Sequence, residues 1–79
     1  MYIEINNSKA VVVYSDGNVV LFSYGVPVAA FIPGRGYLRT AKKWSVTTTR
    51  HINDWLKKSG AETVEVVEQD AIDNLSYNL

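Results

Sequence analysis

Short apolar segments separated by turn residues make up the first part of the chain. Residues 2–5 (YIEI) alternate in polarity, whereas residues 9–14 (KAVVVY) and 19–24 (VVLFSY) are rich in β-branched and aromatic side chains. All three predict β-strands, because these residue types favour extended backbone. Asp16-Gly17 stands between the second and third segments, and this dipeptide favours the tight turn of a β-hairpin. The pattern therefore predicts one strand followed by a hairpin.

The next apolar segment is interrupted by a proline. Residues 28–32 (VAAFI) follow Gly25 and Pro27, and proline has no N–H to donate to a neighbouring strand. We therefore expect an edge strand here, or a strand that begins after a bend. Residues 37–40 (YLRT) predict a further strand, and residues 63–68 (TVEVVE) predict the last one.

The period of the apolar positions changes in the second half of the chain, and residues from about 48 to 59 predict an α-helix. Apolar residues at positions i, i+3 and i+4 form one face of it, and they are Ile52, Trp55 and Leu56. We expect Thr47 or Thr48 to cap the first turn, because a hydroxyl there accepts a backbone N–H. Gly60 follows the last turn, where a left-handed residue commonly ends a helix.

These elements predict an α+β fold in a single domain over residues 1–79. We expect a small antiparallel sheet of about four to six strands with the helix packed on one face. Residues 69–79 (QDAIDNLSYNL) add either one more helical turn or a frayed tail. The composition is that of a globular chain, because 47 % of the residues are hydrophobic and only 20 % are charged.

Several features predict a cytoplasmic protein that does not contact a membrane. The chain has no cysteine, whereas secreted domains of this size are often held by disulfides. Its first residues lack the basic stretch and apolar run of a signal peptide. No apolar segment reaches the roughly 18 residues that a membrane span requires.

The net charge of zero conceals an uneven distribution along the chain. Residues 1–34 carry one basic and two acidic side chains, a net charge of −1. Residues 35–60 carry seven basic side chains and one acidic, a net charge of +6, and residues 61–79 carry five acidic side chains, a net charge of −5. One interpretation is that the basic middle and the acidic end neutralise each other in the fold, where surface pairs contribute about 0–1 kcal/mol each.

The other interpretation is that the basic segment binds an anionic partner. Its basic and aromatic residues form the expected contact set, which is Arg35, Tyr37, Arg39, Lys42, Lys43, Trp44 and Arg50. Trp44 is expected to be either a hydrophobic staple on the helix or an exposed anchor. A rival acidic surface could enter a basic nucleic-acid channel, and it consists of Glu65, Glu68, Asp70 and Asp73.

The sequence offers little for catalysis, and we expect no enzyme activity, no cofactor and no metal. His51 is the only histidine and cysteine is absent, so the usual ligand combinations of a zinc site cannot form. We expect His51 to be a partly packed residue at the margin of the helix face. Thr47, Thr48 and Thr49 precede or begin the helix, where capping is the first expectation and anion binding the second.

Two segments, residues 23–31 (SYGVPVAAF) and 42–56 (KKWSVTTTRHINDWL), together resemble a family of small uncharacterised proteins of bacteriophages and their hosts. The matching positions are Ser23, Tyr24, Val28, Ala29, Trp44, Ser45, Thr47, Thr48, Arg50, His51, Asn53, Trp55 and Leu56. The resemblance implies a phage or prophage protein made in the host cytoplasm. Small phage proteins commonly bind host machinery, and inhibitors of defence systems such as anti-CRISPR proteins are one such class.

Three functions are consistent with these residues. The first is a non-enzymatic phage accessory protein that binds a host protein or ribonucleoprotein, as an inhibitor of host defence would. The second is direct nucleic-acid binding through residues 35–58. The third is a structural or self-associating module that uses the edge strand near Pro27 or the exposed end of the hairpin. The sequence leaves the oligomeric state open.

Overall fold

The computed structural model describes residues 2–7 and 9–77 of the chain. It contains six strands and two helices, which are β1 (Tyr2–Asn7), β2 (Ala10–Ser15), β3 (Asn18–Ser23), β4 (Val26–Ile32), β5 (Gly36–Thr40), α1 (Val46–Ser59), β6 (Val64–Val67) and α2 (Gln69–Tyr77). The expected α+β class is confirmed. The segment that was expected to be a helical turn or a frayed tail forms the nine-residue helix α2.

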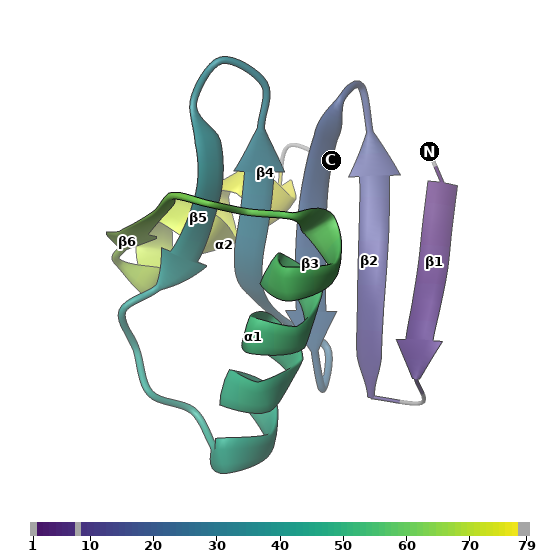
Figure 1. Ribbon diagram of the computed structural model, residues 1–79, viewed down its shortest axis with the longest axis vertical. Helices are drawn as coiled ribbons and strands as arrows, with labels where there is room; N and C mark the ends of the chain where they lie inside the picture. Colours follow the sequence, from purple (N-terminus) through teal and green to yellow (C-terminus); the bar gives the residue numbers. More distant parts are fainter. Residues whose placement is uncertain (1, 8, 78–79) are drawn as a thin grey trace.

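The strands form one sheet in the order in which they occur in the chain, β1-β2-β3-β4-β5-β6. The first five are antiparallel neighbours, as expected, whereas β6 runs parallel to β5. Helix α1 carries the chain back along the sheet between β5 and β6, and such a crossover is what makes two neighbouring strands parallel. Helix α1 lies on one face of the sheet and α2 on the other (Figure 1).

Two hairpin turns have the same backbone geometry. Asp16 and Gly17 join β2 to β3 with φ angles of 53° and 86°, which confirms the hairpin predicted at this dipeptide. Tyr24 and Gly25 join β3 to β4 with φ angles of 53° and 79°. Two consecutive positive φ angles are characteristic of the type I′ turn, whose twist matches that of the strands. Tyr24 adopts this conformation although its side chain disfavours it.

Pro27 does not mark an edge strand, which corrects one of the two expectations; the other fits, because β4 begins at Val26 directly after the Tyr24-Gly25 turn. Strand β4 is internal and pairs with β3 on one side and β5 on the other. The register between β3 and β4 shifts between Leu21 and Phe22, so that Phe22 lies opposite Pro27. The extra residue of this bulge is Val28. A proline is tolerated at a bulge, because the ladder of hydrogen bonds is already interrupted there.

Helix α1 begins two residues before the expected start, and its N-cap is Ser45 rather than Thr47 or Thr48. The Ser45 hydroxyl accepts the backbone N–H of Thr48 at 3.1 Å. Thr48 cannot act as the cap because its own side chain is buried against the sheet. The end of the helix was predicted correctly: Gly60 has a φ of 75°, and its N–H donates to the last carbonyls of α1.

Each helix closes a separate apolar layer. On the α1 side, the predicted face of the helix packs on the sheet, and the buried cluster is Val12, Leu21, Val28, Ala29, Ile52, Trp55 and Leu56. On the α2 side, Ile72 is fully buried, and fully buried sheet residues with the opposite orientation are Val20, Ala30 and Leu38. Helix α2 contacts β4 and β5. The face of β1 on this side stays exposed, because Ile3 and Ile5 retain 55 % and 71 % of their accessible surface.

Candidate functional site: a basic and aromatic end of the sheet

The predicted contact set is divided between opposite ends of the sheet. Arg35 lies in the turn between β4 and β5, which is at the upper end in Figure 1, whereas the segment from Lys42 to Val46 crosses the lower end before α1 begins. Strand β5 separates the two groups. The seven residues therefore do not form one continuous surface.

Arg35 is bound by the acidic end of the chain. Its Nε and Nη2 donate to the two carboxylate oxygens of Glu65 on β6, at 3.3 and 3.0 Å. The hydrogen bond from Arg35 lowers the pKa of the Glu65 carboxyl, and the same bond raises the pKa of Arg35. This pair supports local neutralisation at the upper end, where both side chains are about half exposed.

Tyr37 and Arg39 also have structural partners. The Tyr37 ring packs between Phe31 and Trp55, with centroid distances of 4.8 and 5.7 Å, and its hydroxyl donates to the Ser59 carbonyl at 3.3 Å. Arg39 donates to the Asn53 side chain of α1 at 3.0 Å. Both residues therefore connect β5 to α1, and Tyr37 belongs to the margin of the core.

Lys42, Lys43, Trp44 and Arg50 are exposed together near the start of α1, and we call these four residues the basic end. The Lys42 ammonium lies 4.1 Å from the centroid of the Trp44 ring, within the range of a cation–π contact. Trp44 donates through Nε1 to Gln69 of α2 at 3.1 Å and remains 40 % exposed. Of the two expectations for Trp44, a hydrophobic staple or an exposed anchor, this position fits the exposed anchor.

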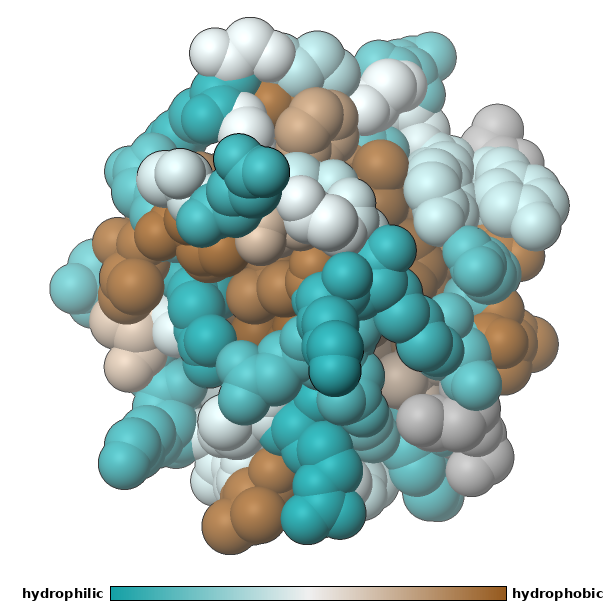
Figure 2. Space-filling model, viewed as in Figure 1, coloured by the Kyte–Doolittle hydropathy of each residue, from teal (hydrophilic) through white to brown (hydrophobic). Residues whose placement is uncertain are grey.

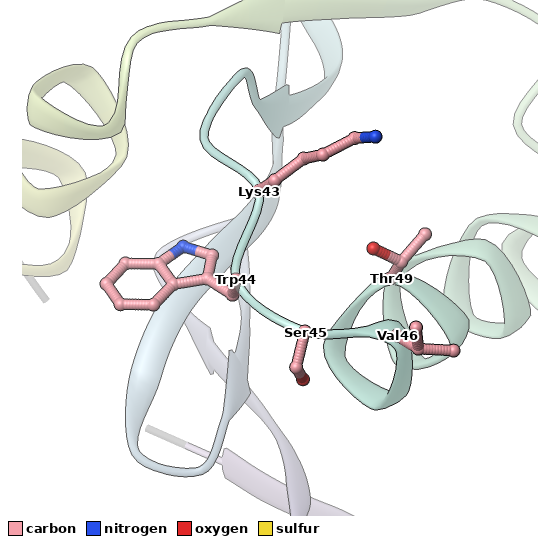
Figure 3. Close-up of a pocket in the computed structure, with 5 residues that line it drawn as sticks. All are labelled: Lys43, Trp44, Ser45, Val46 and Thr49. Atoms are coloured by element: carbon pink, nitrogen blue, oxygen red, sulfur yellow. The ribbon is translucent and has the colours of Figure 1, made fainter.

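A shallow hollow of about 350 Å³ opens beside Trp44. It is lined by Lys43, Trp44, Ser45, Val46 and Thr49. Figure 3 shows the indole on one side of the connecting segment and the Val46 and Thr49 side chains on the first turns of α1. Val46 is 77 % exposed, so the hollow combines a cation, an aromatic ring and an exposed aliphatic group. An open site of this kind can hold a protruding side chain or a planar group of a partner.

Only part of the rival acidic set lies together, because Glu68, Asp70 and Asp73 gather around Gln69 whereas Glu65 is held by Arg35. Glu65 is paired with Arg35, and Asp73 accepts the Gln69 side-chain amide at 2.9 Å. Glu68 and Asp70 line a second hollow together with a basic neighbour from the other set, Lys42. The acidic and basic segments are thus neighbours at two places. The expectation of local neutralisation accounts for Arg35 better than for Lys43 or Arg50.

Three polar side chains that the sequence analysis did not connect meet under α1. The Ser23 hydroxyl lies 2.9 Å from the Thr48 hydroxyl and 2.8 Å from Nδ1 of His51. Ser23 and Thr48 are buried, and His51 is partly packed, as expected. The only signal in the sequence was that Thr48 and His51 are three residues apart on one helix. Their partner on β3 depends on the tertiary fold.

This cluster positions an aromatic residue rather than a reactive hydroxyl. Ser23 is 2 % exposed, so a substrate cannot reach its oxygen although a histidine lies within hydrogen-bond distance. The His51 ring contacts the exposed Tyr24 ring, with 5.8 Å between centroids, and the Lys9 ammonium lies 5.9 Å from the same ring. Tyr24 and Lys9 lie in turns at the lower end of the sheet, which the basic end also occupies (Figure 1).

Two further features limit what the described residues can form. Among residues 2–7 and 9–77, no group of three histidine, cysteine, aspartate or glutamate side chains is placed to hold a metal ion. None of the helices in the described part of the chain is long and apolar enough to cross a membrane.

Comparison with known sequences assigns almost the whole chain to one family. Residues 3–74 match a family described as a family of unknown function (DUF8033). No curated protein and no solved structure matches the chain. The match covers β2 to β6 and α1 entirely, and it includes all but the first residue of β1 and most of α2.

Proposed function

The chain belongs to the family DUF8033, whose function is unknown, and we propose that it is a non-enzymatic binding protein whose basic end contacts a host protein or ribonucleoprotein. The observation that carries the proposal is the exposure of Lys42, Lys43, Trp44 and Arg50 near the start of α1, where Lys43 and Trp44 line an open hollow. Aromatic and basic residues of this kind dominate binding energy at protein interfaces.

The contact surface is smaller than the sequence analysis expected. Arg35, Tyr37 and Arg39 have intramolecular partners, so they hold the fold together and are not primary contacts. Tyr24 joins the surface, because it is 53 % exposed at the same end of the sheet. A partner with an acidic patch beside an apolar or planar group would complement this combination of side chains.

The resemblance to phage proteins supplies the biological part of the proposal. It supports a phage or prophage origin, action in the host cytoplasm, and inhibition of a host defence system in the manner of anti-CRISPR proteins. The two hollows described above are open rather than enclosed, and a small protein with open hollows acts most simply by occupying the working surface of its target.

The test is a pull-down from a bacterial host lysate with the tagged protein, with and without nuclease, measured by quantitative mass spectrometry. The variant Lys42→Gln/Lys43→Gln/Trp44→Ala removes three of the four members of the basic end. The control Lys57→Gln/Lys58→Gln removes the same number of charges from the exposed far end of α1. Thermal melting of both variants establishes that each is folded.

We expect a partner that survives nuclease, is reduced about ten-fold or more by the first variant, and is unchanged by the control. Equal recovery with both variants would overturn the assignment of the surface. Recovery of nucleic acid alone, lost after nuclease and at high salt, would replace this function by direct nucleic-acid binding, because phosphate contacts weaken steeply with salt.

A further inference from the structure

The α2 side of the sheet carries an apolar surface over β1, β2 and the Phe22 end of β3 that helix α2 does not cover, whereas Val20 of β3 is fully buried on this side. Cross-strand partners place its members on one face, since Ile3 lies opposite Val13, and Ile5, Val11 and Phe22 lie in one row across the three strands. Ile3 and Ile5 are exposed, and the other three are half-buried. We call Ile3, Ile5, Val11, Val13 and Phe22 the bare face.

The bare face has no charge. Glu4 is the only charged residue within β1, β2 and β3, and it lies on the other side of the sheet, where it accepts the Tyr14 hydroxyl at 2.8 Å. Figure 2 shows hydrophilic side chains over the exposed side of α1 and hydrophobic atoms at the edge where β1 lies. A partner of the bare face therefore needs an uncharged apolar surface of its own.

We propose that a second copy of this chain covers the bare face, in a two-fold symmetric dimer that packs β1, β2 and β3 against the same strands of its partner. An isologous contact is self-complementary by symmetry, and the chain supplies the charge-free surface that the bare face requires. The net charge of zero means that two copies approach each other without net repulsion.

The position of α2 fits this arrangement. Two packed sheets lie about 10 Å apart, which is close to the diameter of a helix. Because α2 covers β4 and β5, it would stand beside the partner's β1 rather than over it. The dimer would thus cover the bare face and also shield the edge strand β1, which pairs with only one neighbour among the described strands and has no lysine or proline to protect it.

The area of the surface predicts a weak, reversible dimer. Three strands of six residues present a footprint of about 14 by 20 Å, and a flank of α2 adds about 130 Å². The contact would bury at most about 800 Å² in total, because Val20 of β3 is already buried, compared with about 1,200–2,000 Å² for a stable complex. We therefore expect a dissociation constant in the micromolar range or above, and a folded monomer at low concentration.

Sedimentation velocity over a range from about 10 µM to about 1 mM tests the proposal on the wild-type chain and two variants. Ile5→Lys places a charge on the bare face at a position that is already 71 % exposed. Val66→Lys is the matched control, because Val66 is 61 % exposed on the other edge strand, β6. We expect the wild-type chain and Val66→Lys to dimerise, and Ile5→Lys to raise the dissociation constant about ten-fold or more.

A second measurement does not depend on the folding of a variant. In the isoleucine methyl spectrum of the wild-type chain, we expect the signals of Ile3 and Ile5 to shift with concentration and the signal of the buried Ile52 to stay in place. The dimer should persist at about 1 M salt, where charge pairs are screened within about 3 Å. The same salt concentration would weaken binding of a partner to the basic end. The two measurements therefore distinguish failure of the dimer proposal from failure of the proposed function.

Three results would overturn the proposal. The first is a wild-type monomer at every concentration, which would leave the bare face to a different apolar partner. The second is loss of the dimer in Val66→Lys but not in Ile5→Lys, which would assign the contact to β6. The third is concentration-dependent shifts that spare Ile3 and Ile5.

Discussion

The two faces of the sheet are covered to different extents, although both are apolar. On one face, the 14-residue helix α1 closes a buried cluster that reaches from β2 to the parallel strand β6, with Tyr14, Tyr37 and Val64 at its margin. On the other face, the nine-residue helix α2 buries Ile72 over β4 and β5 and leaves the bare face open. The first face is covered from β2 to β6, whereas the second is covered only on the half where α2 packs.

Polar contacts show the same difference. Beneath α1, Ser23, Thr48 and His51 form a hydrogen-bonded cluster between the helix and the sheet. At α2, Gln69 at the beginning of the helix donates to the Pro27 carbonyl at 2.6 Å and accepts from Trp44. Packing and buried hydrogen bonds together fix the position of α1 on its face of the sheet. The uncovered strands on the other face leave room for a partner.

The largest effect should follow from removal of the central side chain of the covered face. Trp55 is 5 % exposed and contacts Tyr37 edge-on. We expect Trp55→Ala to lower the free energy of unfolding by about 3–5 kcal/mol, which can exhaust the stability of a domain of this size. Urea denaturation measures it. Ile5→Ala on the bare face is the control, and its expected change is within about 0.5 kcal/mol; a comparable loss there would contradict the difference between the faces.

The buried polar cluster should give the next largest effect. Ser23→Ala removes the hydroxyl that both Thr48 and His51 contact, and it leaves the buried Thr48 hydroxyl without this partner. We expect a loss of about 1–3 kcal/mol in urea denaturation. Because the two residues share one contact, the double variant Ser23→Ala/Thr48→Val should cost less than the sum of the single variants. Strict additivity would show that the contact between Ser23 and Thr48 contributes nothing to stability.

A smaller effect is expected at the start of α1. Ser45→Ala removes the hydroxyl that accepts the Thr48 N–H, and the loss of an N-cap costs about 1 kcal/mol. Thr47→Ala is the control, because Thr47 is exposed and does not cap the helix. We expect it to lower the free energy of unfolding by no more than a few tenths of the loss for Ser45→Ala. Thermal melting of both variants decides whether Ser45 or Thr47 caps the helix. A larger loss for Thr47→Ala would restore the cap that the sequence alone suggested.

The smallest effect is a titration at the margin of the covered face. The hydrogen bond to Glu4 and partial burial raise the pKa of Tyr14 to about 12. Since the folded-state pKa is above the unfolded value of about 10, this contribution to stability is complete below pH 10 and is lost as the pH rises toward 12. Glu4→Gln should bring the pKa of Tyr14 down toward 10. The ultraviolet absorbance of tyrosinate, taken as the difference from Tyr14→Phe, measures it.

Local signals in the sequence predicted the elements that depend on neighbouring residues. The Asp16-Gly17 turn, the apolar face of α1 and its end at Gly60 follow from backbone geometry and helical spacing, which act over a few residues. The N-cap of α1 was predicted wrongly because several neighbouring hydroxyl side chains could accept a backbone N–H. The sequence favoured Thr47 or Thr48 as the cap of α1, whereas the Ser45 hydroxyl accepts the Thr48 N–H and Thr48 is buried against Ser23.

The candidate site was predictable only in part. The basic and aromatic segment was evident from composition, and four of its members, Lys42, Lys43, Trp44 and Arg50, lie exposed at one end. The other three do not join them, since β5 runs from one end of the sheet to the other and separates Arg35 from Lys42. Sequence neighbours on a strand diverge by about 3.3 Å per residue, so a short charged stretch does not imply a compact patch.

The sequence by itself determined the class of fold, the approximate positions of the six strands and of α1, and the division of the chain into basic and acidic parts. Only the tertiary structure decided that β4 is internal, that Glu65 neutralises Arg35, and that β2 is covered on one face alone. The physical reason is that these outcomes depend on pairs that are far apart in the chain. The apolar run of β2 predicts that its side chains avoid water on both faces of the sheet. Which face is covered depends on where each helix packs.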